Sequence, residues 1–295
     1  MKIAVFTKNL TNPAYSAARM GADRAAATLG AQAVHYVPRQ PDDAQEQSAL
    51  IEQALADPPD AIALSPVHET AIDPALRRIA AAGIPLVGFV SPIRAVKCVS
   101  YVDSDDTQLA TEIAHYLFKH LRGDGNVLVV SGHRHSVTSR DRMTGFEAAA
   151  ACYPGIVLVG TIPGDYERDT ARKVTARWFA DHGNTPLHGC LVANDIMAIG
   201  VLEALRAAGR TVPVVGVNAI PEAIEEIRSG GMLATADFNA MKMGYLATEC
   251  AIRHLRGEAV PPHVRLPVHI VDRHNCALWD MPYERRAITT LEELR

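Results

Sequence analysis

Short apolar runs alternate with amphipathic stretches of helical period along most of the chain. The apolar runs predict β-strands at residues 2–7, 31–37, 60–64, 85–90, 126–130, 156–162, 188–192 and 212–217. The stretches that follow them predict α-helices at residues 13–29, 44–56, 74–82, 107–121, 139–151, 168–181, 195–208 and 221–229. Strands that alternate with helices in this way form parallel sheets with helices on both faces. The pattern therefore predicts an α/β protein.

The predicted strands fall into two series, one before Ser100 and one after Asp124. Each series has the size of one doubly wound sheet, so two Rossmann-like lobes are expected. The residues from His274 to Arg295 break the alternation and are expected to lie as an extension on the surface of one lobe. Ligands of such sheets bind beyond the carboxyl ends of the strands, so the polar residues just after each strand are the candidates for function.

Composition and charge exclude several classes of protein. The 295 residues are 48% hydrophobic, and 29 Lys and Arg oppose 33 Asp and Glu for a net charge of −4. Nucleic acid is not an expected partner, because phosphate binding requires a basic surface. The longest apolar window, residues 79–90, is interrupted by Gly83 and Pro85, so no direct membrane insertion is expected. The five cysteines are an odd number without a CxxC pair, and mostly free, buried thiols are expected.

The usual enzyme motifs are absent from the sequence. No glycine follows the first strand where a dinucleotide-binding loop would need G-x-G-x-x-G, and the Walker, G-x-S-x-G and H-E-x-x-H motifs are missing. His133 and His135 could ligate a metal, but no carboxylate or cysteine lies at ligand spacing, which favours solvated loop histidines. The sequence therefore predicts neither an enzyme, nor a cofactor, nor a metal site.

Amides, an arginine and aromatic rings follow several predicted strands. Asn12 can cap the helix that begins at Pro13, and Asp195 suits a helix cap, which would leave the Asn194 amide for a ligand. Asn218, Arg142 and Tyr166 also follow strands, and Tyr15 lies one turn beyond Asn12; these candidates are Asn12, Tyr15, Arg142, Tyr166, Asn194 and Asn218. Aromatic rings cover the C–H faces of sugars, while amides and guanidinium groups bond their hydroxyls. Together these residues indicate a site for a polyhydroxylated ligand.

The order of several short motifs resembles a known family. They are Asn12-Pro13-x-Tyr15, Asp60-Ala61-Ile62 with Ser65-Pro66, Ala82-Gly83-Ile84-Pro85, Arg142-x-x-Gly145-Phe146, Asn194-Asp195-x-x-Ala198-x-Gly200, Val215-Gly216-Val217-Asn218 and Gly257-Glu258. Over residues 2–272 the chain resembles the type I periplasmic sugar-binding proteins of ABC transporters. That group contains ribose-binding protein and the effector domains of lac-repressor-like regulators.

The resemblance implies the periplasmic binding protein type I fold, in which a three-strand hinge joins the lobes and a sugar or polyol binds in the interlobe cleft. It implies crossings near residues 101–105, 236–238 and 266–269. The first lobe would then contain residues 1–103 and 238–267, and the second residues 104–237 and 268–295. The ligand contacts of the family fall on Asn12 and Tyr15 in the first lobe, and on Arg142, Tyr166, Asn194 and Asn218 in the second.

The sequence departs from ribose-binding members of the family at two positions. Val90-Ser91, after Phe89, stand where those proteins carry Asp-Arg, and Phe238 stands at the position of a Gln. The site thus loses a carboxylate–guanidinium pair and gains apolar surface, while Lys8 after the first strand adds a cation. These departures favour a small polyol or a differently hydroxylated sugar over ribose, with a sugar acid as the alternative.

Arg142 is the predicted main polar contact, because its five donors can engage two ligand oxygens. We expect its guanidinium to be solvated without ligand; a surface ion pair with Asp141 or another neighbour is the alternative. The resemblance further implies an ABC transporter permease as partner, a monomer, and a periplasmic location with the signal peptide removed. The alternative is the ligand-sensing domain of a lac-repressor-like regulator, which would need a helix-turn-helix before residue 1.

Overall fold

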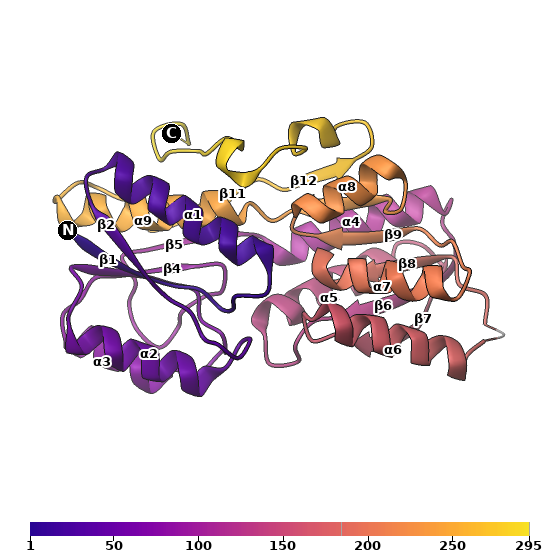
Figure 1. Cartoon of the computed structure of the whole chain (residues 1–295), viewed down its shortest axis with the longest axis horizontal. Coiled ribbons are helices and arrows are strands. Elements are labelled where there is room, and N and C mark those ends of the chain that lie inside the picture. The colour runs from indigo at the N-terminus through magenta and orange to yellow at the C-terminus, as the bar shows by residue number, and fades with distance from the viewer. Residues whose placement is uncertain (184, 295) are drawn as a thin grey trace. The chain divides into compact units, whose positions relative to one another are not determined.

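The computed structural model describes residues 1–183 and 185–294, which form two compact units (Figure 1). Unit 1 comprises Met1–Ser104, Asn239–Pro267 and Tyr283–Arg295, and unit 2 comprises Asp105–Phe238 and Val268–Pro282. The chain therefore passes from one unit to the other four times, whereas the sequence led us to expect three crossings.

The extra crossing changes the predicted course of the C-terminal segment. Residues 283–295 were expected in the second lobe, but they belong to unit 1. They are held there by helix α9 (Ala240–Leu255): Glu249 accepts a hydrogen bond from the backbone N–H of Leu291 at 3.0 Å, and Arg253 pairs with Glu292 at 3.0 Å. The Leu291 side chain is buried, so this contact is part of the packing of unit 1.

Unit 1 is a six-stranded sheet in the order β11-β5-β4-β3-β1-β2, and every strand pair in it is parallel. Its strands are β1 (Lys2–Phe6), β2 (Gln32–Tyr36), β3 (Ala61–Leu64), β4 (Leu86–Phe89), β5 (Ser100–Ser104) and β11 (His263–Leu266). Its helices are α1 (Pro13–Thr28), α2 (Ala44–Ala56), α3 (Asp73–Ala81) and α9. Helices α2 and α3 cover one face of the sheet, and α1 and α9 pack together on the other (Figure 1).

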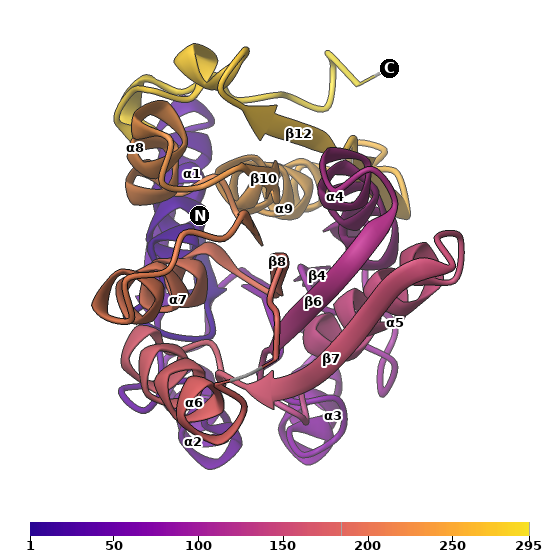
Figure 2. The ribbon, with the colours of Figure 1, turned by 90° about the vertical axis from the view of Figure 1, so that its right-hand side faces the viewer.

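Unit 2 is a second six-stranded sheet, in the order β12-β10-β9-β8-β6-β7, with β12 antiparallel at one edge. Its strands are β6 (Asp124–Ser131), β7 (Gly155–Pro163), β8 (Gly189–Val192), β9 (Val214–Val217), β10 (Ala234–Asp237) and β12 (His269–Asp272). Its helices are α4 (Asp106–His120), α5 (Val137–Ala150), α6 (Arg168–Asp181), α7 (Asp195–Ala207) and α8 (Pro221–Ser229). Figure 2 shows α4 and α5 on one side of this sheet and α6, α7 and α8 on the other. The predicted α/β class with two Rossmann-like lobes is confirmed.

Helix α9 is the main element that the sequence pattern did not predict. Because 12 of its 16 residues are buried, it has no broad polar stripe to reveal a helical period. Glycine lets it lie close to α1: a Cβ atom on Gly244 would collide with the backbone of Ala18, and one on Gly21 with the backbone of Met241. The small residues of both helices are thus required by the close approach of their backbones.

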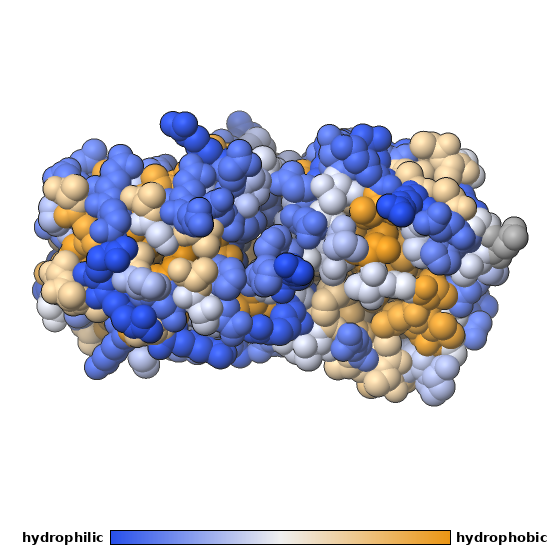
Figure 3. All heavy atoms as spheres, turned by 90° about the horizontal axis from the view of Figure 1, so that it is seen from below, coloured by the Kyte–Doolittle hydropathy of each residue, from blue (hydrophilic) through white to orange (hydrophobic). Residues whose placement is uncertain are grey.

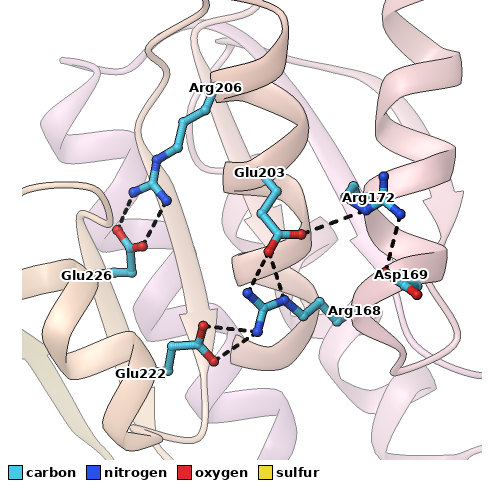
Figure 4. A network of polar contacts seen from close by, with 7 residues as sticks. All are labelled: Arg168, Asp169, Arg172, Glu203, Arg206, Glu222 and Glu226. Atoms are coloured by element: carbon cyan, nitrogen blue, oxygen red, sulfur yellow. Dashed lines mark hydrogen bonds and ion pairs between the residues drawn. The ribbon is translucent and has the colours of Figure 1, made fainter.

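An exposed network of ion pairs links the three helices on one side of unit 2 (Figure 4). Arg168 at the start of α6 pairs with Glu203 of α7 at 2.5 Å and with Glu222 of α8 at 3.0 Å, and Arg206 pairs with Glu226 at 2.5 Å. Exposed pairs contribute only about 0.2–1 kcal/mol each, but together they fix the relative positions of α7 and α8. The loops that precede these two helices carry predicted site residues.

The outer edge of the unit 2 sheet is apolar. Strand β7 is an edge strand without a charged residue, and Val157 on it is exposed. Figure 3 shows hydrophobic residues on this side of unit 2. A β-bulge shifts the register of β6 and β7 between Val127 and Leu128, which is a device that discourages edge-to-edge pairing.

Two further sequence predictions concern cysteines and the membrane. All five cysteines are free, and Cys190, Cys250 and Cys276 are buried, whereas Cys152 is exposed. Among the helices that the structure describes, none combines the length and apolar character needed to cross a bilayer.

Candidate ligand-binding site

The backbone is unusual where the strands end. Non-glycine residues with positive φ follow β4 (Val90, 67°), β7 (Asp165, 51°, and Tyr166, 62°) and β9 (Asn218, 128°, and Ala219, 53°). Such conformations are costly for side chains with a Cβ, above all for a β-branched valine, and they gather at functional sites. Both units therefore place strained backbone at the edge of the sheet where a ligand is expected, one of these residues in unit 1 and four in unit 2.

Lys8 and Ser91 meet at this edge of unit 1. Lys8 follows β1 and Ser91 follows β4, and the Lys8 Nζ atom donates a hydrogen bond to Ser91 Oγ at 2.8 Å. Both side chains are buried. The strained peptide of Val90 is held by Tyr101, whose hydroxyl donates to the Val90 carbonyl at 2.9 Å. The structure thus joins two residues that the sequence singled out separately.

Asn12 and Tyr15 lie at the start of α1, and both are buried. Asn12 Oδ1 accepts from the backbone N–H of Ala14 at 3.0 Å, so the amide oxygen caps the helix and its NH2 group is the part left to meet a ligand. Phe89 lies within β4 and has no exposed surface, so it supports the site from inside unit 1.

Two serines of unit 1 share a feature that sequence reasoning missed. Ser65 follows β3 and Ser104 ends β5, and both hydroxyls are buried without a hydrogen-bond partner among the described residues. A buried, unsatisfied hydroxyl costs free energy, which a bound polar molecule would recover. Their position at strand ends, and for Ser65 its place in the Ser65-Pro66 motif, were the signals in the sequence.

Arg142 of α5 is not solvated, in contrast to the sequence-based expectation. Its side chain is 2% exposed; Nε donates to Asp106 Oδ1 at 2.7 Å and Nη1 to the carbonyl oxygen of Ala193 at 2.5 Å. The guanidinium carbon also lies 4.9 Å from the ring centre of Phe238. The ion-pair partner is Asp106 instead of Asp141, because α4 packs against α5 and brings its first turn to Arg142. Two predicted residues, Arg142 and Phe238, are thereby placed together.

The helix cap predicted for Asp195 is supplied by Asn194. Asn194 is the N-cap of α7, and its Oδ1 accepts from the backbone N–H of Met197 at 3.0 Å. Its Nδ2 atom is buried and has no partner in the part of the chain that the structure describes. A buried amide donor of this kind, at the carboxyl end of a central strand, is what a ligand oxygen would satisfy.

Asp195 does not cap the helix but is fully buried. Its carboxylate accepts from the Thr235 hydroxyl at 2.7 Å and from the backbone N–H of Ile220 at 3.1 Å. Burial raises the pKa of Asp195 to about 7, although these hydrogen bonds and the nearby Arg142 oppose the shift. The carboxyl group therefore titrates near neutral pH.

The remaining predicted residues of unit 2 also lie at strand ends. Asn218 is buried, and its backbone N–H donates to the carbonyl oxygen of Ala236 at 2.8 Å. The Tyr166 ring lies over Gly132 so closely that a Cβ atom there would collide with it. Because Gly132 follows β6, the ring is fixed beside two strand ends.

Metal binding is not supported by the described residues. The rings of His133 and His135 are 5.5 Å apart, and Arg134 Nε lies 2.8 Å from His135 Nε2. No group of three potential metal ligands occurs in the described part of the chain.

The family follows from a comparison with known proteins. The sequence profile of the family described as "periplasmic binding protein domain" matches residues 3–259, well over half of the chain. The chain belongs to this family. The family resemblance drawn from the motifs is thus confirmed.

Individual relatives of this periplasmic binding protein agree with that assignment. It is 26% identical over 196 residues to a xylitol-binding protein of Mycolicibacterium smegmatis, an alignment that spans 66% of this chain and 56% of that relative. It is 29% identical over 242 residues, 78% of this chain and 75% of the relative, to a D-ribose/D-allose-binding protein of Pseudomonas aeruginosa. The crystal structure of an ABC transporter periplasmic solute-binding protein from Actinobacillus succinogenes with bound D-allose has a TM-score of 0.88 at 27% identity, and the match covers 94% of this chain and 99% of that one.

These relatives also bear on the broader class of the periplasmic binding protein. They are named as binding proteins, the D-allose-bound structure is that of an ABC transporter solute-binding protein, and a further relative is a ribose import binding protein of Haemophilus influenzae; the prediction that the chain is not an enzyme is confirmed. The chain matches little more than half the length of the xylitol-binding relative, although it spans nearly all of the D-allose-bound structure.

Proposed function

We propose that this periplasmic binding protein captures a small sugar or polyol for uptake by an ABC transporter. The observation that carries the proposal is the buried Nδ2 atom of Asn194, a donor with no partner in the described residues. Around it, unit 2 offers Arg142, Tyr166, Asn218 and Phe238 at the same edge of its sheet. We assign the corresponding contacts of unit 1 to Asn12, Tyr15, Ser65, Ser104 and the Lys8–Ser91 pair.

Each side chain then has a distinct role toward the ligand. Asn12 and Asn194 use their amide oxygens as helix caps and so offer N–H donors to hydroxyl oxygens. Arg142 is fixed by Asp106 and by the Phe238 ring, so little rotamer entropy remains to be lost on binding. Tyr15 and Tyr166 supply ring faces for the C–H surface of the ligand.

An uncharged polyhydroxylated compound is the first ligand class. A sugar acid is the second, and Lys8 is the observation that favours it, because a buried ammonium group next to Ser91 would attract a carboxylate. The relatives bind xylitol, or D-ribose and D-allose, so these three compounds are the first probes. The regulator alternative is not proposed, since the relatives are transporter components.

Location and partners follow from the same proposal. The protein would act in the periplasm after removal of a signal peptide, as a monomer that delivers its ligand to a permease. Light scattering of the purified chain tests the monomer, and a dimeric mass would reject it.

A thermal-shift screen tests the ligand class. The set contains xylitol, D-ribose, D-allose, other polyols, sugar acids, amino acids and nucleotides. A ligand that binds only the folded state raises the melting temperature, with a gain of about 2.7 kcal/mol at 100 times its Kd. We expect stabilisation by polyhydroxylated compounds, confirmed by calorimetry; hits confined to amino acids or nucleotides would reject the proposal.

A further inference from the structure

Asp195 links three strands of unit 2. It is the first residue of α7, next to Asn194, and no part of its side chain reaches solvent. Its Oδ1 accepts from Thr235 of β10, and its Oδ2 accepts from the backbone N–H of Ile220, which follows β9. One carboxylate thus connects the ends of β8 and β9 with Thr235 within β10.

The turn that Asp195 holds is strained. Asn218 and Ala219 both have positive φ, and such residues cost about 1–3 kcal/mol each and persist only where the surrounding structure holds them. Here the backbone N–H of Ala219 donates to Thr235 Oγ1 at 3.4 Å, and the Thr235 hydroxyl donates in turn to Asp195. The Asp195 carboxylate therefore holds the turn by two routes: it accepts directly from the Ile220 N–H, and through the Thr235 hydroxyl it holds the Ala219 N–H.

The sheet leaves room for this carboxylate. A Cβ atom on Gly216 of β9 would collide with Asp195 Oδ1. The cap of α7 is supplied by Asn194, so Asp195 is not required for that purpose. Its buried position serves the turn at residues 218–220.

We propose that Asp195 is a positioning residue for ligand binding: its ionised carboxylate sets Asn218 by holding the strained turn, and its protonation weakens ligand affinity. This inference rests on the proposed function, because it assumes that Asn218 contacts the ligand.

The charge state is decided by the surroundings of Asp195. From α5, Arg142 favours the carboxylate, and its own partner is Asp106 of α4. The contacts from β10 and from the turn are made by the uncharged donors Thr235 and Ile220. The other carboxylates nearby have partners of their own: Asp237, at the end of β10, accepts a hydrogen bond from Trp279. Glu222 of α8 pairs with Arg168. The effect of burial outweighs that of Arg142 and of the hydrogen bonds, and it raises the pKa of Asp195 to about 7.

Protonation changes what the group can do. A carboxyl O–H is a donor, so a proton on Oδ2 ends the hydrogen bond from the Ile220 N–H, and a proton on Oδ1 forces the Thr235 hydroxyl to turn and accept. Affinity is then highest above pH 8 and falls as the pH drops through about 7.

Calorimetry on the full chain between pH 5.5 and 8.5, with xylitol and D-allose as probes, tests the affinity. We expect the wild type to bind roughly tenfold more weakly at pH 5.5 than at pH 8.5, from the loss of one buried acceptor. Asp195→Asn mimics the protonated group, so it binds about tenfold more weakly at pH 8.5 and has a flat profile. Thr235→Ser keeps the hydroxyl and the wild-type profile. Asp169→Asn, which changes an exposed first-turn aspartate of α6, is the matched control and leaves the profile unchanged.

A ligand-free measurement separates this inference from the proposed function. Hydrogen exchange by NMR reports the protection of the Ile220 amide, which we expect to fall at least tenfold in Asp195→Asn at pH 8. Should that variant fail to fold, Thr235→Val removes the acceptor of the Ala219 amide, whose protection is then expected to fall at least tenfold. Unchanged protection of Ile220, or a sloping affinity profile in Asp195→Asn, overturns the inference. If neither probe binds the wild type, the ligand assignment fails for these compounds, while the exchange data still decide the role of Asp195.

Discussion

At the scale of single residues, Arg142 is fixed from three sides: by Asp106, by the Ala193 carbonyl and by the Phe238 ring. Arg142→Ala leaves the buried Asp106 carboxylate without this partner, so we expect the free energy of unfolding to fall by about 3–5 kcal/mol. Loss of the guanidinium also weakens sugar binding by about 30-fold or more. Urea denaturation and calorimetry measure the two effects.

Arg142→Lys is the control for this prediction. It keeps a charge near Asp106, so it retains more stability than the alanine variant, but it loses the planar fork and binds weakly. Wild-type stability of Arg142→Ala would contradict the buried pairing.

Asp195 also makes stability depend on pH. Its pKa is about 7 in the folded protein and near 3.8 in the unfolded chain, so the folded state binds the proton more tightly. The stabilisation is complete below pH 3.8 and is lost as the pH rises through about 7. We expect the urea midpoint to fall between pH 5 and pH 8 in the wild type, and to fall less in Asp195→Asn. An equal loss in both proteins would exclude Asp195 as the cause.

The sequence predicted which candidate residues follow strands better than it predicted their hydrogen-bond partners. Residues that follow a strand, such as Lys8 and Asn194, could be found because the strands themselves were predicted from their apolar runs. The contact of Arg142 with Asp106 could not, since it depends on how α4 packs on α5. The assignment of the cap to Asp195 failed because two neighbouring residues both suit a cap, and only the buried turn at Ile220 decides between them.

At the scale of elements, the close crossing of α1 and α9 limits the substitutions that either helix tolerates at the contact. A methyl group added at Gly244 meets the backbone of Ala18, so Gly244→Ala forces the helices apart. We expect a loss of about 1–3 kcal/mol in the free energy of unfolding, measured by urea denaturation. Ser16→Ala, on the exposed side of α1, is the control and is expected within about 0.5 kcal/mol of the wild type.

The same helix shows why some elements escaped sequence analysis. Amphipathic helices such as α3 carry a polar face toward solvent and were predicted, whereas α9 is covered almost all round. Its period is therefore hidden, and the alternation of strands and helices could be followed only to residue 229.

At the scale of the whole molecule, the segment after Pro282 belongs to unit 1, whereas the segment before it, Val268–Pro282, belongs to unit 2. Deleting residues 283–295 removes the buried Leu291 and one donor to the buried Glu249. We expect a loss of about 2–5 kcal/mol in the stability of unit 1. Because Trp178 and Trp279 both belong to unit 2, tryptophan fluorescence should change less than circular dichroism, which reports both units.

Leu291→Ala, which keeps the segment, should reproduce part of that loss, about 2–3 kcal/mol. A truncated chain with an unaltered dichroism midpoint would show that the segment is dispensable for unit 1.

The four passages of the chain between units also set the order in which the two units can be completed as the chain emerges from its N-terminus. Unit 2 is built mainly from the continuous stretch Asp105–Phe238, which lacks only the edge strand β12. Unit 1 receives α9 and β11 only after Leu266 has been synthesised, so its first 104 residues emerge with the face that α9 later covers still open. Domains fold as their residues become available during synthesis. The unit that begins first along the chain is thus completed last.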